Sequence, residues 1–208
     1  MLDKFLKLNP DKKERILEAA YNEFSINTYE NASTNRIVKE AGIGKGMLFF
    51  YFNSKKDLNI YLVEEGVEYI KKEYVDKIDE NETDFLEKWK SLSRIKFEAY
   101  KKRPYIFNFM ANVYLNNDME ELPADLKSRI KEITGLGYAK LFKNLDTSLF
   151  RSDLSEEKVM RYIKLMMAGY EMELVERLKG VNFHEMDVEP LWDEFYEYID
   201  DLKTIFYK

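Results

Sequence analysis

The chain of 208 residues is long enough for one domain or two small ones, and 45% apolar with 35% charged residues is a globular composition. It contains no cysteine, which excludes disulfides and thiolate metal sites. The net charge is −6, yet residues 1–60 hold ten Lys or Arg against eight Asp or Glu. A basic head on an acidic body is typical of a protein that meets nucleic acid at one end.

No stretch of the sequence is suited to a membrane or to export. The longest uninterrupted apolar run covers residues 47–52, far short of the thickness of a bilayer. The first ten residues lack the apolar core and the small-residue cleavage site of a signal peptide. We therefore expect the protein in the cytoplasm.

Every segment favours helix and none alternates like a strand, so we expect an all-α fold. Residues 9–11, Asn-Pro-Asp, are typical of a helix start. Ser54 should cap a long helix, and Thr83 the helix that follows it. The helices are expected at about residues 10–26, 33–41, 44–52, 54–78, 83–102, 104–115, 123–150, 155–180 and 188–206.

The stretch from Ser33 to Leu58 is typical of a helix-turn-helix, whose second helix enters the major groove of DNA. The Ser33 hydroxyl can cap the first helix, and Gly42 can take the left-handed conformation that ends it. Ile43 then folds back as a plug, and Gly44 starts the second helix. Five Lys or Arg stand against one Glu between positions 33 and 56, so phosphates should dock here.

These residues resemble the DNA-binding signature of the TetR family of bacterial transcription regulators. With the preceding helix, the resemblance covers roughly the first quarter of the chain. The sequence departs from the family at Gly44, where a capping serine is usual, at Met47, and at Phe49, where a tyrosine usually meets a phosphate. The matching residues are Ile37, Ala41, Gly42, Ile43, Lys45, Gly46, Leu48, Tyr51, Phe52, Lys55 and Leu58.

The resemblance implies a homodimer that binds a palindromic DNA operator, with a DNA-binding domain at residues 1–54 and an effector-binding and dimerisation domain at 55–208. Lys45 and the backbone of Gly46 should meet base edges, and Tyr51 and the lysines after it should hold phosphates. The residues expected at DNA are Ser33, Thr34, Arg36, Lys45, Gly46, Met47, Phe49, Phe50, Tyr51, Lys55 and Lys56.

The body is rich in methionine and aromatic residues at helical spacing. Such residues are most often plain core, but they also line adaptable apolar pockets between helices. The resemblance implies a pocket of this kind, and we expect a small hydrophobic or aromatic effector. The residues expected to line it are Trp89, Phe97, Tyr100, Phe107, Met110, Tyr114, Met167 and Tyr170.

The last two helices are apolar on more than one side. A surface helix needs one apolar stripe, so the second stripe should meet another copy of the chain. Ala168 and Gly169 would allow the helices to approach closely. The alternative is burial within a single chain. The residues expected at the interface are Met166, Leu174, Leu178, Trp192, Phe195, Ile199 and Leu202.

The sequence offers little for catalysis. His184 is the only histidine, which leaves no metal site and no catalytic triad, so we expect no enzyme activity, no metal and no cofactor. Our hypothesis is a ligand-responsive regulator, a repressor rather than an activator. Two alternatives stay open. One is an activator, or a regulator controlled by a protein partner without a small effector, and the other is an enzyme that carries this head.

Overall fold

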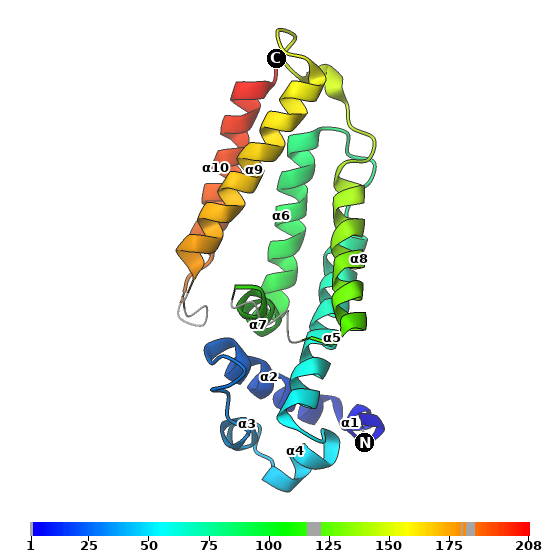
Figure 1. Cartoon of the computed structure of the whole chain (residues 1–208), viewed down its shortest axis with the longest axis vertical. Coiled ribbons are helices and arrows are strands. Elements are labelled where there is room, and N and C mark those ends of the chain that lie inside the picture. The colour runs from blue at the N-terminus through cyan, green and yellow to red at the C-terminus, as the bar shows by residue number, and fades with distance from the viewer. Residues whose placement is uncertain (1, 116–121, 180, 182–185) are drawn as a thin grey trace. The chain divides into compact units, whose positions relative to one another are not determined.

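The computed structural model describes residues 2–115, 122–179, 181 and 186–208, and confirms an all-α fold (Figure 1). An antiparallel bridge between Phe150 and Tyr207 is the only β pairing in these ranges. No helix there has the length and apolar character needed to cross a membrane. The α-helices are α1 (Leu2–Leu6), α2 (Pro10–Ile26), α3 (Thr34–Glu40), α4 (Lys45–Tyr51), α5 (Lys55–Glu73), α6 (Phe85–Lys102), α7 (Pro104–Leu115), α8 (Ala124–Leu141), α9 (Glu156–Leu178) and α10 (Glu189–Phe206).

The contacts between residues divide the chain into two compact units. Unit 1 comprises Met1–Ile70 and Tyr100–Ile130, and unit 2 comprises Lys71–Ala99 and Lys131–Lys208. Each unit has buried apolar residues of its own. The domain boundary expected after Ser54 stays a prediction.

Helices α2 and α7 form the centre of unit 1. α2 begins where expected, because the Asn9 side chain accepts the N–H of Asp11 at 2.9 Å. The buried ring of Tyr21 lies 5.3 Å from that of Phe109 on α7, measured between centroids. The Tyr21 hydroxyl is 2.8 Å from the carbonyl oxygen of Leu62 on α5. The buried face of α2 thus joins helices that come much later in the chain.

Asn112 of α7 closes the C-terminal end of α2. Its side-chain amide donates to the carbonyl oxygens of Phe24 and Ser25, at 3.0 and 3.1 Å. The last carbonyls of a helix have no partner within the helix, so an outside donor stabilises that end. α7 therefore completes α2 as well as packing on it.

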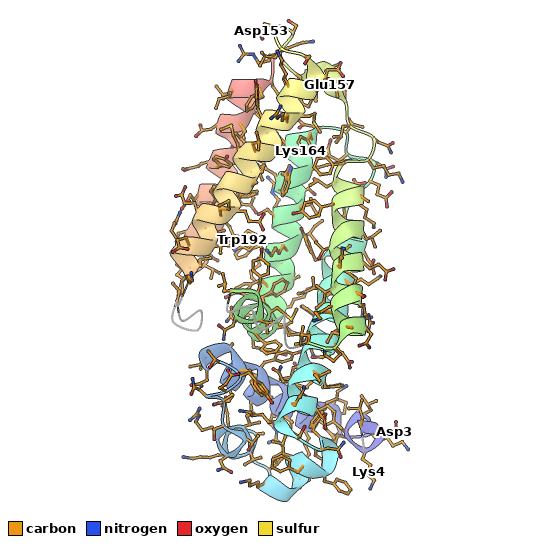
Figure 2. The ribbon with its side chains drawn as sticks, in the orientation of Figure 1. Asp3, Lys4, Asp153, Glu157, Lys164 and Trp192 are labelled. Carbon is orange, nitrogen blue, oxygen red and sulfur yellow. The ribbon has the colours of Figure 1, made fainter. Side chains whose placement is uncertain are left out.

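The core of unit 2 contains α6, α9 and α10. Ile163 of α9 and Ile199 and Leu202 of α10 have no exposed surface. Trp192 of α10, labelled in Figure 2, lies with its ring 5.2 Å from that of Phe97 on α6. α10 is therefore held against α6 by aromatic as well as aliphatic contacts.

Helices α5 and α6 each differ at one end from the expectation. α5 ends at Glu73 rather than near residue 78, because the chain tightens into the 3₁₀ turn η1 (Val75–Lys77), whose valine is buried. The cap of α6 is Asp84, not Thr83. The Asp84 carboxylate accepts two backbone N–H groups of the first turn, at 2.9 and 3.0 Å.

Helix α8 ends at Leu141 rather than near Phe150. The cause lies just beyond, where Asn144 has a φ of 54°. Asparagine visits this left-handed conformation more easily than most residues, and a helix cannot continue through it. The expected end of the next helix at Gly180, and the single histidine His184, lie outside the described residues.

Candidate nucleic-acid interface

Helices α3 and α4 form the helix-turn-helix expected from the sequence. Gly42 between them has a φ of +64°, the left-handed conformation that glycine adopts without a steric penalty. The N–H of Ile43 donates to the Val38 carbonyl at 3.0 Å and closes the turn. Ala41 is 1% exposed, so the turn packs against its neighbours. The direction in which α4 leaves α3 is therefore set by local backbone geometry.

Helix α4 has a buried face and an open face. Leu48 and Tyr51 are buried. Lys45, the first residue of α4, and the apolar side chains of Met47 and Phe50 are exposed. A helix that contacts base edges in a DNA groove has this arrangement. The exposed residues of α4 are Lys45, Gly46, Met47 and Phe50. The other predicted contacts of this region, Ser33, Thr34 and Phe49, are partly buried.

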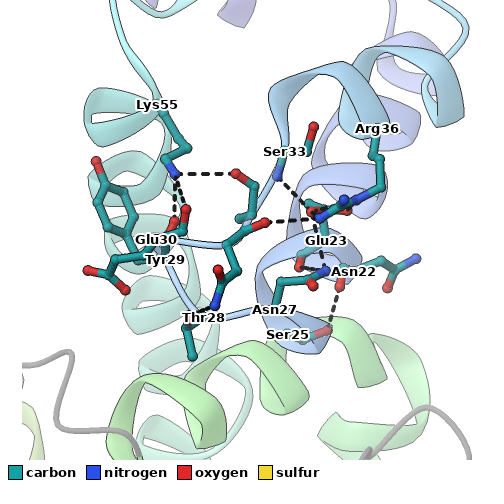
Figure 3. Close-up of polar contacts among 12 residues, drawn as sticks. Asn22, Glu23, Ser25, Asn27, Thr28, Tyr29, Glu30, Ser33, Arg36 and Lys55 are labelled. Carbon is teal, nitrogen blue, oxygen red and sulfur yellow. Dashed lines mark hydrogen bonds and ion pairs between the residues drawn. The ribbon is translucent and has the colours of Figure 1, made fainter.

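The carboxylate of Glu23, in a side chain 6% exposed, ties α2 to the start of α3 (Figure 3). It accepts the backbone N–H of Ser33 at 2.7 Å and the Nε–H of Arg36 at 2.8 Å. The expected hydroxyl cap is wrong, because Ser33 makes no side-chain cap bond and contributes its N–H instead. The bond to Glu23 raises the pKa of Arg36 above its ordinary value. Arg36, expected at DNA, is thus engaged within the head.

Lys55 of α5 clamps the loop that precedes α3 (Figure 3). Its ammonium donates to the carbonyl oxygens of Tyr29, Glu30 and Ala32, at 2.7, 3.1 and 3.2 Å. Its Nζ also lies 4.6 Å from the centroid of the Tyr29 ring. A lysine ammonium has three N–H donors, and three carbonyls take them. This occupancy argues against the phosphate contact expected of Lys55.

Tyr51 is buried, whereas Lys56 is exposed. Tyr51 is 4% exposed and its ring lies 5.7 Å from that of Phe5 on α1, which is poor placement for the expected phosphate contact. Lys56 is exposed in the first turn of α5. The expected cap of α5 is present, since the Ser54 hydroxyl accepts the N–H of Asp57 at 3.0 Å.

Two residues that organise the head were missed by sequence reasoning. Glu23 lies on the face of α2 that buries Ala20 and Phe24, and an acid at such a position indicates an internal partner. Phe5 has no exposed surface although it belongs to a five-residue helix at the start of the chain. No local pattern marks Phe5, because its partners come from α4 and α5.

The residues expected to line an effector pocket fall into both units. In unit 1 the rings of Tyr100 and Phe107 lie 6.0 Å apart, and in unit 2 Tyr170 stacks on Tyr198 at 4.7 Å. Two shallow hollows of the described chain lie elsewhere, around residues 147–165, and are open to solvent. The pocket stays a prediction. Unit 1 holds Tyr100, Phe107, Met110 and Tyr114, and unit 2 holds Trp89, Phe97, Met167 and Tyr170.

Several residues expected at a dimer interface pack inside unit 2. The expectation is wrong for Ile199 and Leu202, which have no exposed surface, because they fill the core within one chain. Two exposed apolar side chains of α9, Leu165 at 58% and Met172 at 74% exposure, lie on the opposite side of that helix from its buried residues. Tyr162 is also 41% exposed, but its ring lies 6.5 Å from that of buried Phe206 on α10.

Comparison with known proteins identifies the region around the helix-turn-helix. The family model for bacterial regulatory proteins of the tetR family matches residues 16–62. An HTH-type transcriptional regulator of Staphylococcus aureus is 40% identical over 58 residues, which are 28% of this chain. The matched part spans only 31% of the length of that relative.

Solved structures extend the likeness to nearly the whole chain. A TetR family transcriptional regulator from Chloroflexus aurantiacus has a TM-score of 0.61 at 22% identity, covering 99% of this chain and 98% of that one. A ketosteroid transcriptional regulator of Mycobacterium tuberculosis has a TM-score of 0.62 at 18% identity, covering 97% of both. At these identities the likeness shows the fold. The family model and the relative together identify residues 16–62 as the DNA-binding region of the tetR family of bacterial regulatory proteins.

Proposed function

We propose that the protein is a transcription regulator that binds a palindromic duplex as a homodimer, with α4 in the major groove. The observation that carries the proposal is the exposed face of α4, held by the Gly42 turn and by the internal contacts of Glu23 and Lys55. A helix presented in this way is what a helix-turn-helix uses to reach base edges. The matched family region supports the same function.

Lys45 and Gly46 are the residues that we assign to the bases. Lys45 is exposed in the first turn of α4, and a lysine can donate to the O6 and N7 atoms of guanine. No atom lies within 4 Å of the position that a Cβ would take at Gly46, so its backbone can approach DNA closely. Lys56 is assigned to a phosphate, which positions the head without reading sequence.

The test is selection of genomic fragments by the full chain, followed by binding measurements from 50 to 200 mM salt. We expect a palindromic site with two chains bound, half-sites about 34–36 Å apart or a multiple of that, and affinity that falls steeply with salt. Lys45→Ala should cost about 1–3 kcal/mol and relax preference at one position of each half-site. Equal binding to all sequences, or affinity independent of salt, would contradict the function.

The homodimer is assigned to the exposed stripe of α9. Leu165 and Met172 are exposed although they are large and apolar, and Ala168 and Gly169 lie between them. The buried stripe of α9 is on the other side, so α9 has the two apolar faces of a helix that is covered twice. The occupant that we propose is a second copy of the chain, because Arg161 and Glu176 carry opposite charges at opposite ends of this stripe.

Antiparallel pairing of α9 with its copy brings unlike groups together. A twofold axis at the pair Ala168–Gly169 places Leu165 against the partner's Met172 and Arg161 against the partner's Glu176. Arg161 and Glu176 are exposed in the single chain, and the Lys179 ammonium that lies 3.9 Å from the Glu176 carboxylate is exposed too, so Glu176 can exchange this partner for Arg161 of the second copy. The small residues at the crossing let the two backbones approach closely. An interface of this kind is isologous, as closed dimers require.

Charge reversal tests the register. Arg161→Glu and Glu176→Arg should each weaken self-association, because each places like charges opposite one another. An equal mixture of the two variants should form a heterodimer, and the double variant should regain the homodimer, as measured by sedimentation and native mass spectrometry. A mixture that stays monomeric shows the register to be wrong. A wild-type chain that is monomeric at micromolar concentration contradicts the dimer.

We propose further that the protein is a repressor, and that a small hydrophobic effector binds it and releases it from DNA. The support comes from a protein of similar fold, the transcriptional regulator FadR of Bacillus subtilis, whose crystal structure is in complex with stearoyl-CoA. Its TM-score is 0.53 at 19% identity, covering 89% of this chain and 96% of that one. A ligand of the folded chain should raise its melting temperature by mass action and change its DNA affinity by the reciprocal coupling factor. A thermal-shift series of acyl-CoAs and steroids, followed by DNA binding, tests this.

A regulator controlled by a protein partner is the alternative. It is favoured by the open character of the two hollows at residues 147–165 and by their separation from the predicted pocket residues. Two results together support this alternative. No compound shifts the melting temperature, and the affinity for DNA changes when a co-purifying protein is added. A reporter gene placed behind the selected site distinguishes repression from activation.

A further inference from the structure

Helix α1 is anchored to the recognition helix α4 by a buried ring. Phe5 has no exposed surface. Its ring centroid lies 5.7 Å from Tyr51, 4.9 Å from Phe52 and 5.6 Å from Tyr61. Aromatic pairs at these distances stabilise a packing beyond the area that they bury. α1 is therefore held in a defined place at the C-terminal end of α4.

The residue before this anchor brings a positive charge to the exposed face of α4. The Nζ atom of Lys4 lies 4.1 Å from the centroid of the Phe50 ring, and Phe50 is 49% exposed. Lys4 is itself exposed and is labelled on α1 in Figure 2. Within the described part of the chain no carboxylate forms an ion pair with Lys4. The charge is thus localised but not neutralised.

An ammonium held over an aromatic face still has donors for another acceptor. The ring attracts the cation through its negative face and covers one side of it. A lysine ammonium has three N–H groups, so others remain free to bond. The ring also restricts a flexible side chain, which lowers the entropy lost when a second partner binds. Beside a helix that lies in the major groove, the acceptor that DNA offers is a backbone phosphate.

We propose that Lys4, held over Phe50, binds a DNA phosphate at the edge of the groove that α4 enters, which makes α1 part of the DNA interface. The inference rests on the DNA-binding function proposed above. Phe50 then acts as a positioning residue, whose ring holds Lys4 in place and does not read a base. The sequence patterns pointed to Phe50 as a DNA contact and left Lys4 out.

The experiment measures the salt dependence of DNA binding by the full chain, on the duplex that the wild-type protein selects. The variants are Lys4→Ala, Lys4→Arg and, as a control, Lys131→Ala, which removes one charge from an exposed site on α8. Lys4→Ala should lower the slope of log affinity against log salt by about 0.9 per subunit, with the same loss on the operator and on mutated operators. Lys4→Arg and Lys131→Ala should keep the wild-type slope.

A wild-type slope for Lys4→Ala overturns the inference and leaves the proposed function intact. A wild-type protein that binds without salt dependence overturns the proposed function itself. Because the same titrations measure both, the two failures are distinguishable.

Phe50→Leu separates positioning from direct contact. Leucine keeps an exposed apolar side chain but lacks the ring face, so this change should reduce the slope in the wild-type background. In the Lys4→Ala background it should have no further effect, because the two residues act as one unit. An additional loss of affinity in that background, at an unchanged slope, shows that Phe50 itself meets DNA and overturns the positioning role.

Discussion

Replacing Lys55 by methionine should loosen the loop before α3 without removing a DNA contact. Methionine keeps a long apolar stem but has no N–H donor. The carbonyl oxygens of Tyr29, Glu30 and Ala32 would lose their common donor. Because this loop leads into α3, the change acts on the support of the helix-turn-helix.

The expected loss is about 2–3 kcal/mol, worked from the three bonds. The bonds to Tyr29 and Ala32 are partly buried, and each unmade bond costs about 1 kcal/mol, whereas the exposed carbonyl of Glu30 can turn to water. The lost contact between the ammonium and the Tyr29 ring adds about 0.5–1 kcal/mol. For a chain of this size the melting temperature should fall by roughly 4–12 °C.

Hydrogen exchange gives the most direct measurement. The amide of Ala32 donates to the Thr28 carbonyl at 2.9 Å, and a loss of about 2 kcal/mol should speed its exchange roughly 30-fold. Far-UV circular dichroism should follow the unfolding of the whole chain. Tryptophan fluorescence is unsuited to the head, since Trp89 and Trp192 both belong to unit 2.

Lys56→Met is the matched control, at the next position of the same helix. Lys56 is exposed, so its loss should leave exchange in the loop unchanged and lower the salt slope of DNA binding by about 0.9 per subunit. The reverse pattern, with wild-type exchange and a reduced slope in Lys55→Met, would refute the reasoning and assign Lys55 to a phosphate.

Three further changes test the head and two partly buried tyrosines. Gly46→Ala should stabilise α4 by about 1 kcal/mol, since the space beside Gly46 is open and alanine favours helix. The same change should weaken DNA binding, because the added methyl group keeps the backbone of α4 away from the DNA. Urea unfolding measures the first effect and binding titrations the second. Gly42→Ala should destabilise the head by about 1–2 kcal/mol because its φ is +64°, and an unchanged unfolding midpoint would show that the turn needs no glycine. Burial raises the pKa of Tyr61 and of Tyr74 from 10.0 to about 12, so these tyrosines ionise in the unfolded chain first and the free energy of unfolding should fall from pH 10 to pH 12. Tyrosinate absorbance, read beside circular dichroism, measures this fall. Constant stability over that range would contradict it.

The helix-turn-helix could be predicted because its signals are local. Gly42 ends α3 through its own backbone conformation, and Leu48 is buried at the spacing that a short amphipathic helix requires. The same holds for Asn9 and Ser54, whose caps lie within three residues of the side chain that makes them. Where a feature depends on neighbours in the chain, the pattern of residues is enough.

The roles of charged residues could not be predicted in the same way, because their partners are distant in the chain. Lys55 and Lys56 look alike in sequence, but only the former meets carbonyls more than twenty residues away. Arg36 finds Glu23 thirteen positions earlier. A lysine or arginine that binds a phosphate and one that binds the protein's own backbone have the same local signature. The fold alone separates them.

The two apolar faces of the last helices show a related limit. Periodicity indicates that a helix is covered twice, but it does not tell which face meets the core of its own chain. Ile199 is fully buried within unit 2, while Leu165 and Met172, outside the expected set, remain exposed. The choice is made by packing between helices, and no single helix contains that information.

The bonds from Asn112 to the end of α2 have a consequence for the order in which the protein is made. During synthesis the helix-turn-helix leaves the ribosome long before α7, yet α2 has neither its C-terminal donor nor the Phe109 ring against Tyr21 until α7 follows. Domains generally fold as units as the chain emerges. The DNA-binding head is therefore completed only after Leu115 has been added, and a nascent chain arrested before that point should expose the apolar face of α2 to chaperones.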